Sequence, residues 1–360
     1  MKINEWLRGI FLSLIALNPM ALAGPIPWPP GRINTQSILA QADLLCRGTV
    51  AELSGADVSF RNAKPVTALL NLERCYKGSL PTGQVRVTFA PPANPEVYAP
   101  SFFLRKGEYA LFSLNGSAPE FSFASSIYGK IKISSLVKKD NADIGKAALE
   151  ADLKAGLSDP DSSLVIANLE LLMGMGEVHS TAEIKSIATS SDLEVRGTAL
   201  LALMRLGDYS MLQDAVSFLS LDLSDSQQNL LQNPVRYEFE RIKDPTILLV
   251  LHHNLNSPVF FVRSAMVKGM KSVQSPDSVA YLIRTLDDKE PEIRFDSVIA
   301  LAFIEKKTGE EWATTVGPDY QKKEPAIIQR WKNWWNDEGR YKYSTPPDVA
   351  KKADKSEVSQ

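Results

Sequence analysis

The chain of 360 residues contains only two cysteines and three histidines, so the side chains that bind transition metals are scarce. It also lacks a Gly-x-Ser-x-Gly turn, a glycine-rich phosphate loop and a calcium-binding loop. The three histidines, His179, His252 and His253, all lie in the second half, and no motif pairs one of them with a nucleophile. We therefore expect no enzyme activity, no catalytic residues, no cofactor and no metal.

Strong net charge is absent too, with 40 basic and 42 acidic residues and a formal net charge of −2. Removing the predicted N-terminal signal takes away two basic residues and one acidic residue, which leaves 38 against 41. A nearly neutral chain has no electrostatic field that would attract the phosphates of nucleic acid. We expect no nucleic-acid partner.

No long hydrophobic run is present, but the N-terminus has the pattern of a signal peptide over residues 1–23. Lys2 and Arg8 precede or flank an apolar stretch at 10–17, and the small residues at 21–23 suit a signal peptidase. The alternative is a retained membrane anchor, but the apolar stretch is about half of what a bilayer crossing needs. The sequence predicts export to the periplasm or secretion, with no stable membrane span after cleavage.

Both ends of the mature chain have biased composition. Residues 24–34 are rich in proline, which predicts a stiff linker; a proline-rich ligand for a partner domain is the alternative. Residues 344–360 are polar and rich in Lys, Asp and Ser, which predicts a disordered tail.

Residues 35–137 have the character of strands. Short runs rich in β-branched or aromatic residues are separated by Gly, Pro and Asn turns; the runs are 44–50, 66–76, 84–89 and 108–114. This spacing favours a small antiparallel β-barrel or sandwich. If the first two runs form a hairpin, Cys46 and Cys75 lie opposite each other. A disulfide there closes a loop of about 30 residues and contributes about 3 kcal/mol; the alternative is two buried thiols.

From residue 145 to 312 the apolar residues recur every three or four positions, which predicts amphipathic helices. The pattern repeats: a shift of 31 positions superimposes 164–177 on 195–208 and 245–270 on 276–301. A repeat of this length is one helical hairpin, which must stack on its neighbours to bury its apolar face.

Two segments depart from the repeat. The polar stretch 221–233 predicts an irregular insertion, after which Asn233 and Pro234 restart a helix as N-cap and first-turn proline. In the Trp-rich segment 313–343, Trp331, Trp334 and Trp335 share one helical face. We expect this segment to close the end of the array; an exposed stacking platform for a glycan or peptide is the alternative.

The helical half resembles HEAT-type repeats. The matching residues are Val195, Arg196, Ala199, Leu203, Leu206, Gly207 and Asp208. The resemblance implies a curved α-solenoid that binds other proteins. We interpret the recurring arginines 196, 263 and 294 as bonding neighbouring carbonyls or acids; a ladder of anion-binding sites is the alternative.

The strand half resembles the netrin-like, OB-type barrel of tissue inhibitors of metalloproteinases, on residues 42–50, 72–78 and 106–112. Those inhibitors chelate a protease's metal through an N-terminal Cys and its amine. The predicted mature end here is Gly24, with no Cys nearby.

The whole chain thus predicts a multi-domain protein of α and β class, an OB-like barrel followed by a HEAT-like α-solenoid. The predicted function is non-enzymatic binding of a protein partner of unknown identity on the concave face, formed by the second helices at 181–189, 210–219, 246–255 and 277–286. The exposed positions expected to contact the partner are Lys185, Gln213, His253 and Arg284. The alternative is an inhibitor or accessory subunit of an extracytoplasmic enzyme that acts through the barrel.

Overall fold

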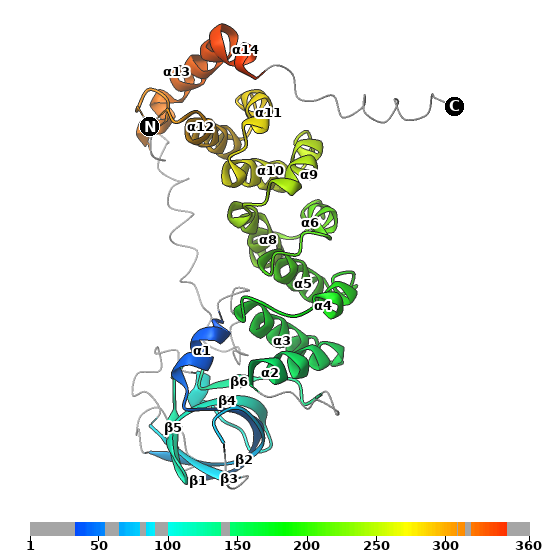
Figure 1. Ribbon diagram of the computed structural model, residues 1–360, viewed down its shortest axis with the longest axis vertical. Coiled ribbons are helices and arrows are strands. Elements are labelled where there is room, and N and C mark those ends of the chain that lie inside the picture. The colour runs from blue at the N-terminus through cyan, green and yellow to red at the C-terminus, as the bar shows by residue number, and fades with distance from the viewer. Residues whose placement is uncertain are drawn as a thin grey trace, which may run out of the picture.

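A computed structural model describes residues 33–54, 65–79, 84–90, 100–137, 145–307, 309–313 and 318–343. The predicted signal peptide, nearly all of the predicted linker and the predicted disordered tail lie outside these residues. Figure 1 shows a β-barrel at one end of an elongated molecule and a stack of helices that leads away from it.

The barrel contains six strands: β1 (Leu44–Ser54), β2 (Val66–Lys77), β3 (Gln84–Phe89), β4 (Tyr109–Ser117), β5 (Glu120–Phe123) and β6 (Lys130–Lys132). The sheet order is β1-β2-β3-β5-β4, and pairing of β1 with β4 closes the cylinder. All pairs are antiparallel except β3 with β5. β6 pairs with residues 110–112 of β4, on the same edge of β4 that pairs with β5 at 114–117, so the closed cylinder itself has five strands. The predicted OB-like barrel is confirmed.

Alternation of buried and more exposed residues in β3 and in the first part of β2 places one face of these strands inside the barrel, while β1 and β4 contain runs of consecutive buried residues. In β3, for example, Val85, Val87 and Phe89 are buried and the intervening residues are exposed. Cys46 of β1 is paired in register with Cys75 of β2, and the two form a disulfide. The disulfide predicted from the hairpin register is confirmed.

The segment 35–41, which we expected to belong to the barrel, instead forms the helix α1 (Thr35–Gln41). Asn34 caps it by accepting a hydrogen bond from the backbone N–H of Ser37. The helix packs against the helical half of the chain, on the C-terminal end of α3 (Ser162–Gly174). The segment that precedes the barrel in the sequence therefore packs on the helical half.

The helical half consists of two layers. The first layer contains the stacked helices α3, α5 (Leu193–Arg205), α8 (Asn233–Glu238), α10 (Phe260–Val273) and α12 (Pro291–Glu305). The second layer contains α4 (Ala182–Ile187), α6 (Leu212–Leu219), α9 (Leu248–Asn254) and α11 (Val279–Thr285), which pack on the first. In Figure 1 the second layer lies to the right of the first. α2 (Gly145–Ala155) joins the stack to the barrel.

The 31-residue repeat reappears as structure, because α3 and α5 begin 31 positions apart, as do α9 and α11, and α10 and α12. Equivalent residues cap equivalent helices. Asp161 and Asp192 accept hydrogen bonds at the N-termini of α3 and α5. Asp244 and Ser275 do the same at the short 3-10 turns that directly precede α9 and α11. The predicted helical hairpins and their stacking are confirmed, while membership of the HEAT family stays a prediction.

The predicted insertion at 221–233 is helical rather than irregular. A short helix α7 (Asp225–Gln227) continues as the π-helical turn η3 (Gln228–Gln232), which runs directly into α8. Asn233 therefore lies inside a continuous helical segment, and the prediction that it serves as an N-cap is wrong. The N-cap at this point is Ser224, whose side chain forms a capping box with Gln227.

The far end of the stack is closed by α13 (Pro318–Trp334), the turn η7 (Trp335–Gly339) and α14 (Arg340–Lys342). Trp331 and Trp334 are buried, and the Trp331 ring packs on Trp312 with 4.7 Å between centroids. The Trp331 indole N–H donates to the Trp312 carbonyl. This burial supports the interpretation of these tryptophans as a cap.

The barrel and the stack share one apolar core. Leu45, Tyr76 and Leu111, on the outside of the barrel, belong to the same buried cluster as Leu149 and Leu153 of α2. A second cluster fills the barrel interior. Among the residues described, no helix combines the length and apolar character needed to cross a bilayer.

Candidate functional site

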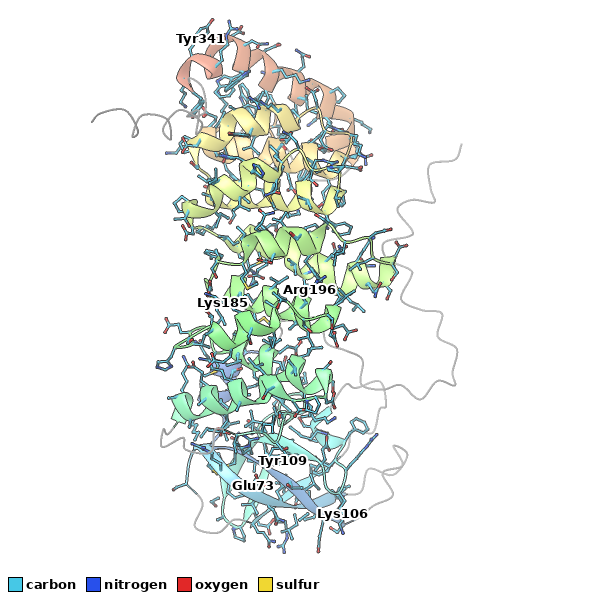
Figure 2. All side chains as sticks on the ribbon, turned by 90° about the vertical axis from the view of Figure 1, so that its right-hand side faces the viewer. Glu73, Lys106, Tyr109, Lys185, Arg196 and Tyr341 are labelled. Atoms are coloured by element: carbon cyan, nitrogen blue, oxygen red, sulfur yellow. A yellow bond between two sulfur atoms is a disulfide. The ribbon has the colours of Figure 1, made fainter. Side chains whose placement is uncertain are left out.

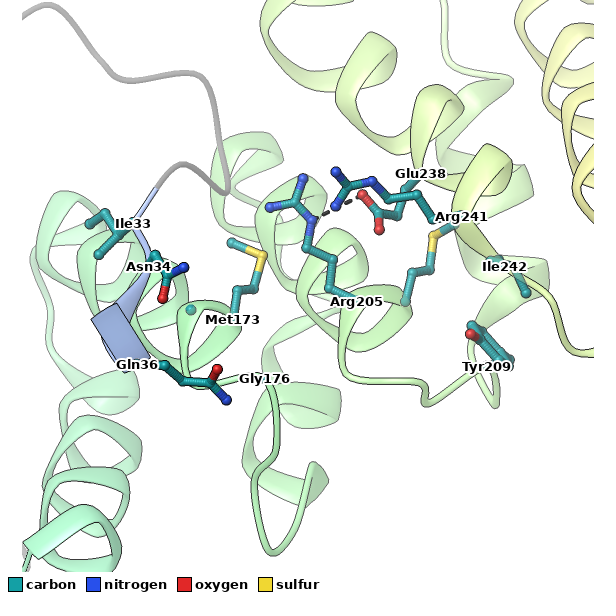
Figure 3. A pocket seen from close by; sticks show the side chains of 12 residues that line it. Ile33, Asn34, Gln36, Met173, Gly176, Arg205, Tyr209, Glu238, Arg241 and Ile242 are labelled. Carbon is teal, nitrogen blue, oxygen red and sulfur yellow. Dashed lines mark hydrogen bonds and ion pairs between the residues drawn. The ribbon is translucent and has the colours of Figure 1, made fainter. Parts of the chain in front are cut away.

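A cavity of about 540 Å³ lies where α1 meets the ends of three stacked helices. Its lining residues are Ile33, Asn34, Gln36, Met173, Gly174, Gly176, Met204, Arg205, Tyr209, Glu238, Arg241 and Ile242. They come from the start of α1, from the C-terminal ends of α3 and α5, and from the end of α8 with the turn that follows it. Figure 3 shows α1 on one side of the cavity and the arginines on the other.

The wall formed by α1 depends on a close approach to α3. The Thr35 hydroxyl donates to the Leu171 carbonyl at 2.6 Å, and the Gln36 amide donates to the Met175 carbonyl at 2.7 Å. These bonds satisfy carbonyls at the end of α3 that have no partner within the helix. A Cβ on Gly174 would lie 2.2 Å from the Ile33 carbonyl oxygen, so only glycine fits there.

The opposite wall carries the charge. Arg205 donates from Nε to the Glu238 carboxylate at 2.9 Å, and the Glu238 side chain is only 5% exposed. Arg241 is exposed and makes no hydrogen bond or ion pair with any residue that the structure describes. The three side chains together leave one positive charge on the cavity. Burial, followed by the charges of Asp244 and Glu238, raises the pKa of Tyr209, so its hydroxyl stays protonated at neutral pH.

These groups can bind a polar ligand. The two guanidinium groups and the Asn34 and Gln36 amides offer hydrogen-bond donors, and Met173 and Met204 offer adaptable apolar surface. None of the twelve lining residues is Ser, Thr, Cys, His or Lys; Glu238 and Tyr209 are the lining residues of a type that can act as a nucleophile, and Arg205 holds the Glu238 carboxylate. An extended polar peptide or an acidic side chain matches this set of donors.

A buried ionic network fixes the barrel to the helices. Arg47 of β1 and Asp152 of α2, both 1% exposed at the side chain, lie 3.5 Å apart. The Tyr76 hydroxyl donates to Asp152 at 2.8 Å, and Arg47 also donates to the Ser134 carbonyl at 2.7 Å. Burial raises the pKa of Tyr109, whose hydroxyl accepts from Arg47, to about 12. Because every charge has a partner, this network is structural.

A second buried network crosses the stack at Lys268 of α10. The ammonium lies 2.8 Å from Asp296 and 3.0 Å from Glu240, and it is 6% exposed. Lys271 contacts the same two acids at 2.7 and 3.1 Å. Burial alone would lower the pKa of Lys268, but Asp296 and Glu240 raise it, so the ammonium stays charged. These mutually paired charges link the turn after α8, which contains Glu240, to α10 and α12.

The four residues predicted to contact a partner all lie on the second layer. Gln213, His253 and Arg284 are exposed, while Lys185 is partly exposed and lies 2.7 Å from Asp208. In Figure 1 the array is curved, with the second layer on its convex side and with α1 and α12 on the opposite side. The four residues therefore lie on the outer side of the bend rather than on the concave face that we expected. Their role in binding stays a prediction.

No feature of the sequence predicted the cavity. Its position depends on α1 crossing to α3, which joins residues more than a hundred positions apart. The glycines at 174 and 176 could have marked a close approach of backbones, but a helix C-terminus explains them equally well. No group of three or more His, Cys, Asp or Glu arranged to bind a metal occurs among the described residues.

No family model matches this chain, and no curated protein is significantly similar to it.

Proposed function

We propose that this chain is an exported, non-enzymatic adaptor that binds a protein partner on its helical array, which is HEAT-like. The observation that carries the proposal is the open cavity beside α1, where Arg241, which has no partner among the described residues, lies near the apolar side chains of Met173 and Met204. Stacked hairpins also give an extended surface suited to protein partners. The disulfide supports an oxidising compartment outside the cytoplasm.

The partner segment expected in the cavity is extended and acidic. Arg241 is the exposed, unpaired cation of the cavity, and Arg205 is held in place by Glu238. A carboxylate between the two guanidinium groups would form charge-assisted hydrogen bonds in a partly enclosed site. The second-layer positions Lys185, Gln213, His253 and Arg284 form the alternative contact surface.

Site-specific photo-crosslinking in the native envelope tests the proposal. A photoreactive residue in place of Met173 in the cavity, Gln213 on the second layer or Lys106 on the barrel reports which surface contacts a protein. We expect Met173 to yield one discrete adduct, whose partner mass spectrometry identifies. Charge reversal by Arg241→Glu should abolish that adduct, because a guanidinium is replaced by a carboxylate that repels an acidic segment.

Arg86→Glu is the matched control, because Arg86 is an exposed barrel arginine far from the cavity in sequence and fold. An adduct at Met173 that survives Arg241→Glu would reject the cavity as the binding site. Adducts from Lys106 alone would instead favour the accessory or inhibitor function of the barrel. Any such inhibitor would need a route other than a cysteine thiolate, because Cys46 and Cys75 are joined in the disulfide.

A further inference from the structure

Four arginines occupy one equivalent position, the fourth residue of a first-layer helix. They are Arg196 of α5, Arg236 of α8, Arg263 of α10 and Arg294 of α12. Because the fold repeats, each arginine serves as an internal reference for the others.

In two units the guanidinium is fully engaged. Arg263 grips Asp288 with two parallel hydrogen bonds of 2.7 and 3.0 Å, and Arg294 grips Glu324 in the same way at 2.8 and 3.1 Å. The remaining nitrogen of each donates to two carbonyls of the loop before its own helix, such as those of Ser257 and Pro258. This confirms the interpretation of these two arginines as bonding carbonyls and acids.

Arg236 is paired in a different way. Its guanidinium lies 3.2 Å from the Glu292 carboxylate and donates to the Tyr237 hydroxyl at 2.7 Å. Thus three of the four equivalent arginines have an acid of the chain as partner.

Arg196 is the exception. Its side chain makes no hydrogen bond or ion pair with any residue in the described part of the chain, and its Nε is buried without a partner. The guanidinium carbon lies 5.4 Å from the centre of the Phe218 ring, which covers one face of the group. Figure 2 labels Arg196 midway along the array.

The stretch that follows Arg196 differs from the one that supplies the acid in the other units, because the helix α7 begins in it. Asp288 follows Arg263 by 25 positions, and Glu324 follows Arg294 by 30. The corresponding stretch after Arg196 is 221–226, where α7 begins, and its aspartates make no ion pair with Arg196. Residues 221–224 still form a loop that carries Asp222, but no ion pair joins Asp222 or Asp225 to Arg196 in the described structure.

We infer that Arg196 is a binding position for a carboxylate supplied from outside the chain. The same fork at Arg263 and Arg294 already holds a carboxylate with two bonds, and the aromatic support at Phe218 keeps the Arg196 group in place. The inference rests on the proposed function only in assigning the carboxylate to a protein partner. The source is an Asp or Glu side chain or a C-terminal carboxylate.

Nuclear magnetic resonance of the full chain labelled with ¹⁵N-arginine tests this directly. The Nε–H signal of Arg196 is the one that disappears in Arg196→Gln. Three probes are titrated at constant ionic strength: N-acetyl-glutamate amide carries only a side-chain carboxylate, N-acetyl-alanine carries only a terminal one, and N-acetyl-glutamine amide is neutral. We expect a saturable shift of this signal with a carboxylate probe. The apparent affinity for the neutral probe should be at least about tenfold weaker. The tighter carboxylate probe identifies the source.

Equal shifts with the neutral probe, or no saturable shift at all, would overturn the inference. Stability provides a second measurement, with Arg263→Gln as the matched variant. Arg196→Gln should lower Tm by no more than about 2 °C, because only the contact with the Phe218 ring is lost, while Arg263→Gln should lower Tm by roughly 6 °C. An equal loss in both variants would show that Arg196 has an internal acid, which also overturns the inference. Neither measurement involves the cavity, so the crosslinking test can fail independently.

Discussion

Arg47 provides the sharpest test of how the barrel is held on the helices. Its guanidinium is buried among Asp152, Tyr76, Tyr109 and the carbonyl of Ser134. Replacing it by methionine keeps most of the volume and removes the charge, so Asp152 remains buried with less compensation. Breaking a buried ion pair costs about 3–5 kcal/mol.

The lower end of that range applies here, because Asp152 keeps the hydrogen bond from Tyr76 and lies 3.4 Å from Arg74. We therefore expect Arg47→Met to destabilise the chain by about 3 kcal/mol. At about 2 °C for each kcal/mol, Tm falls by roughly 6 °C. Differential scanning calorimetry should also resolve a separate barrel transition, since the link to α2 is weakened.

Arg86→Met is the matched control, because Arg86 of β3 pairs with Glu120 at 2.7 Å in an exposed position, with 56% of its side chain accessible. An exposed pair contributes at most about 1 kcal/mol, so Tm should change by no more than roughly 2 °C. Equal effects of the two substitutions would refute the conclusion that the Arg47 network joins the two parts.

Three further perturbations have defined outcomes. Replacing Cys46 and Cys75 by alanine opens a loop of 29 residues and should cost about 3 kcal/mol, measured by denaturant unfolding of the barrel; an unchanged midpoint would contradict this. Gly174→Ala should push α1 away from α3 and speed amide hydrogen exchange in α1, with the barrel strands as internal reference. Although burial opposes it, Lys185 with hydroxyl donors holds the pKa of Asp208 well below its usual value near 3.9. The ionised carboxylate therefore stabilises the fold above about pH 4 and stops doing so as pH falls further, so Asp208→Asn should lower Tm at pH 7 and flatten its decline in acid.

Much of the fold could be predicted because its causes are local or periodic. Runs of β-branched and aromatic residues between turn residues identified the strands, and the hairpin register placed Cys46 opposite Cys75. The 31-residue shift identified the hairpins, because the apolar contacts of one unit recur in the next. Burial of Trp331 followed from the need to cover the last apolar face.

The remaining features depend on contacts between distant segments. The position of α1 is decided by the end of α3, and the sequence of 35–41 alone contains no sign of that partner. The prediction that the second helices form the concave face was wrong, because periodicity shows which helix faces are apolar but not towards which layer the array curves. The pairing of each repeat arginine likewise depends on an acid in another unit, so the exception at Arg196 is visible only in three dimensions.

The place of α1 has a consequence for how the protein matures. The Thr35 hydroxyl has no acceptor until Leu171, which follows it by 136 positions, has been synthesised. Until that stretch has been synthesised, Ile38 and its neighbours lack the helical surface that covers them in the folded protein. The growing chain therefore exposes the apolar side chains of residues 35–41 while the barrel can already fold. A chaperone can bind these side chains during this interval.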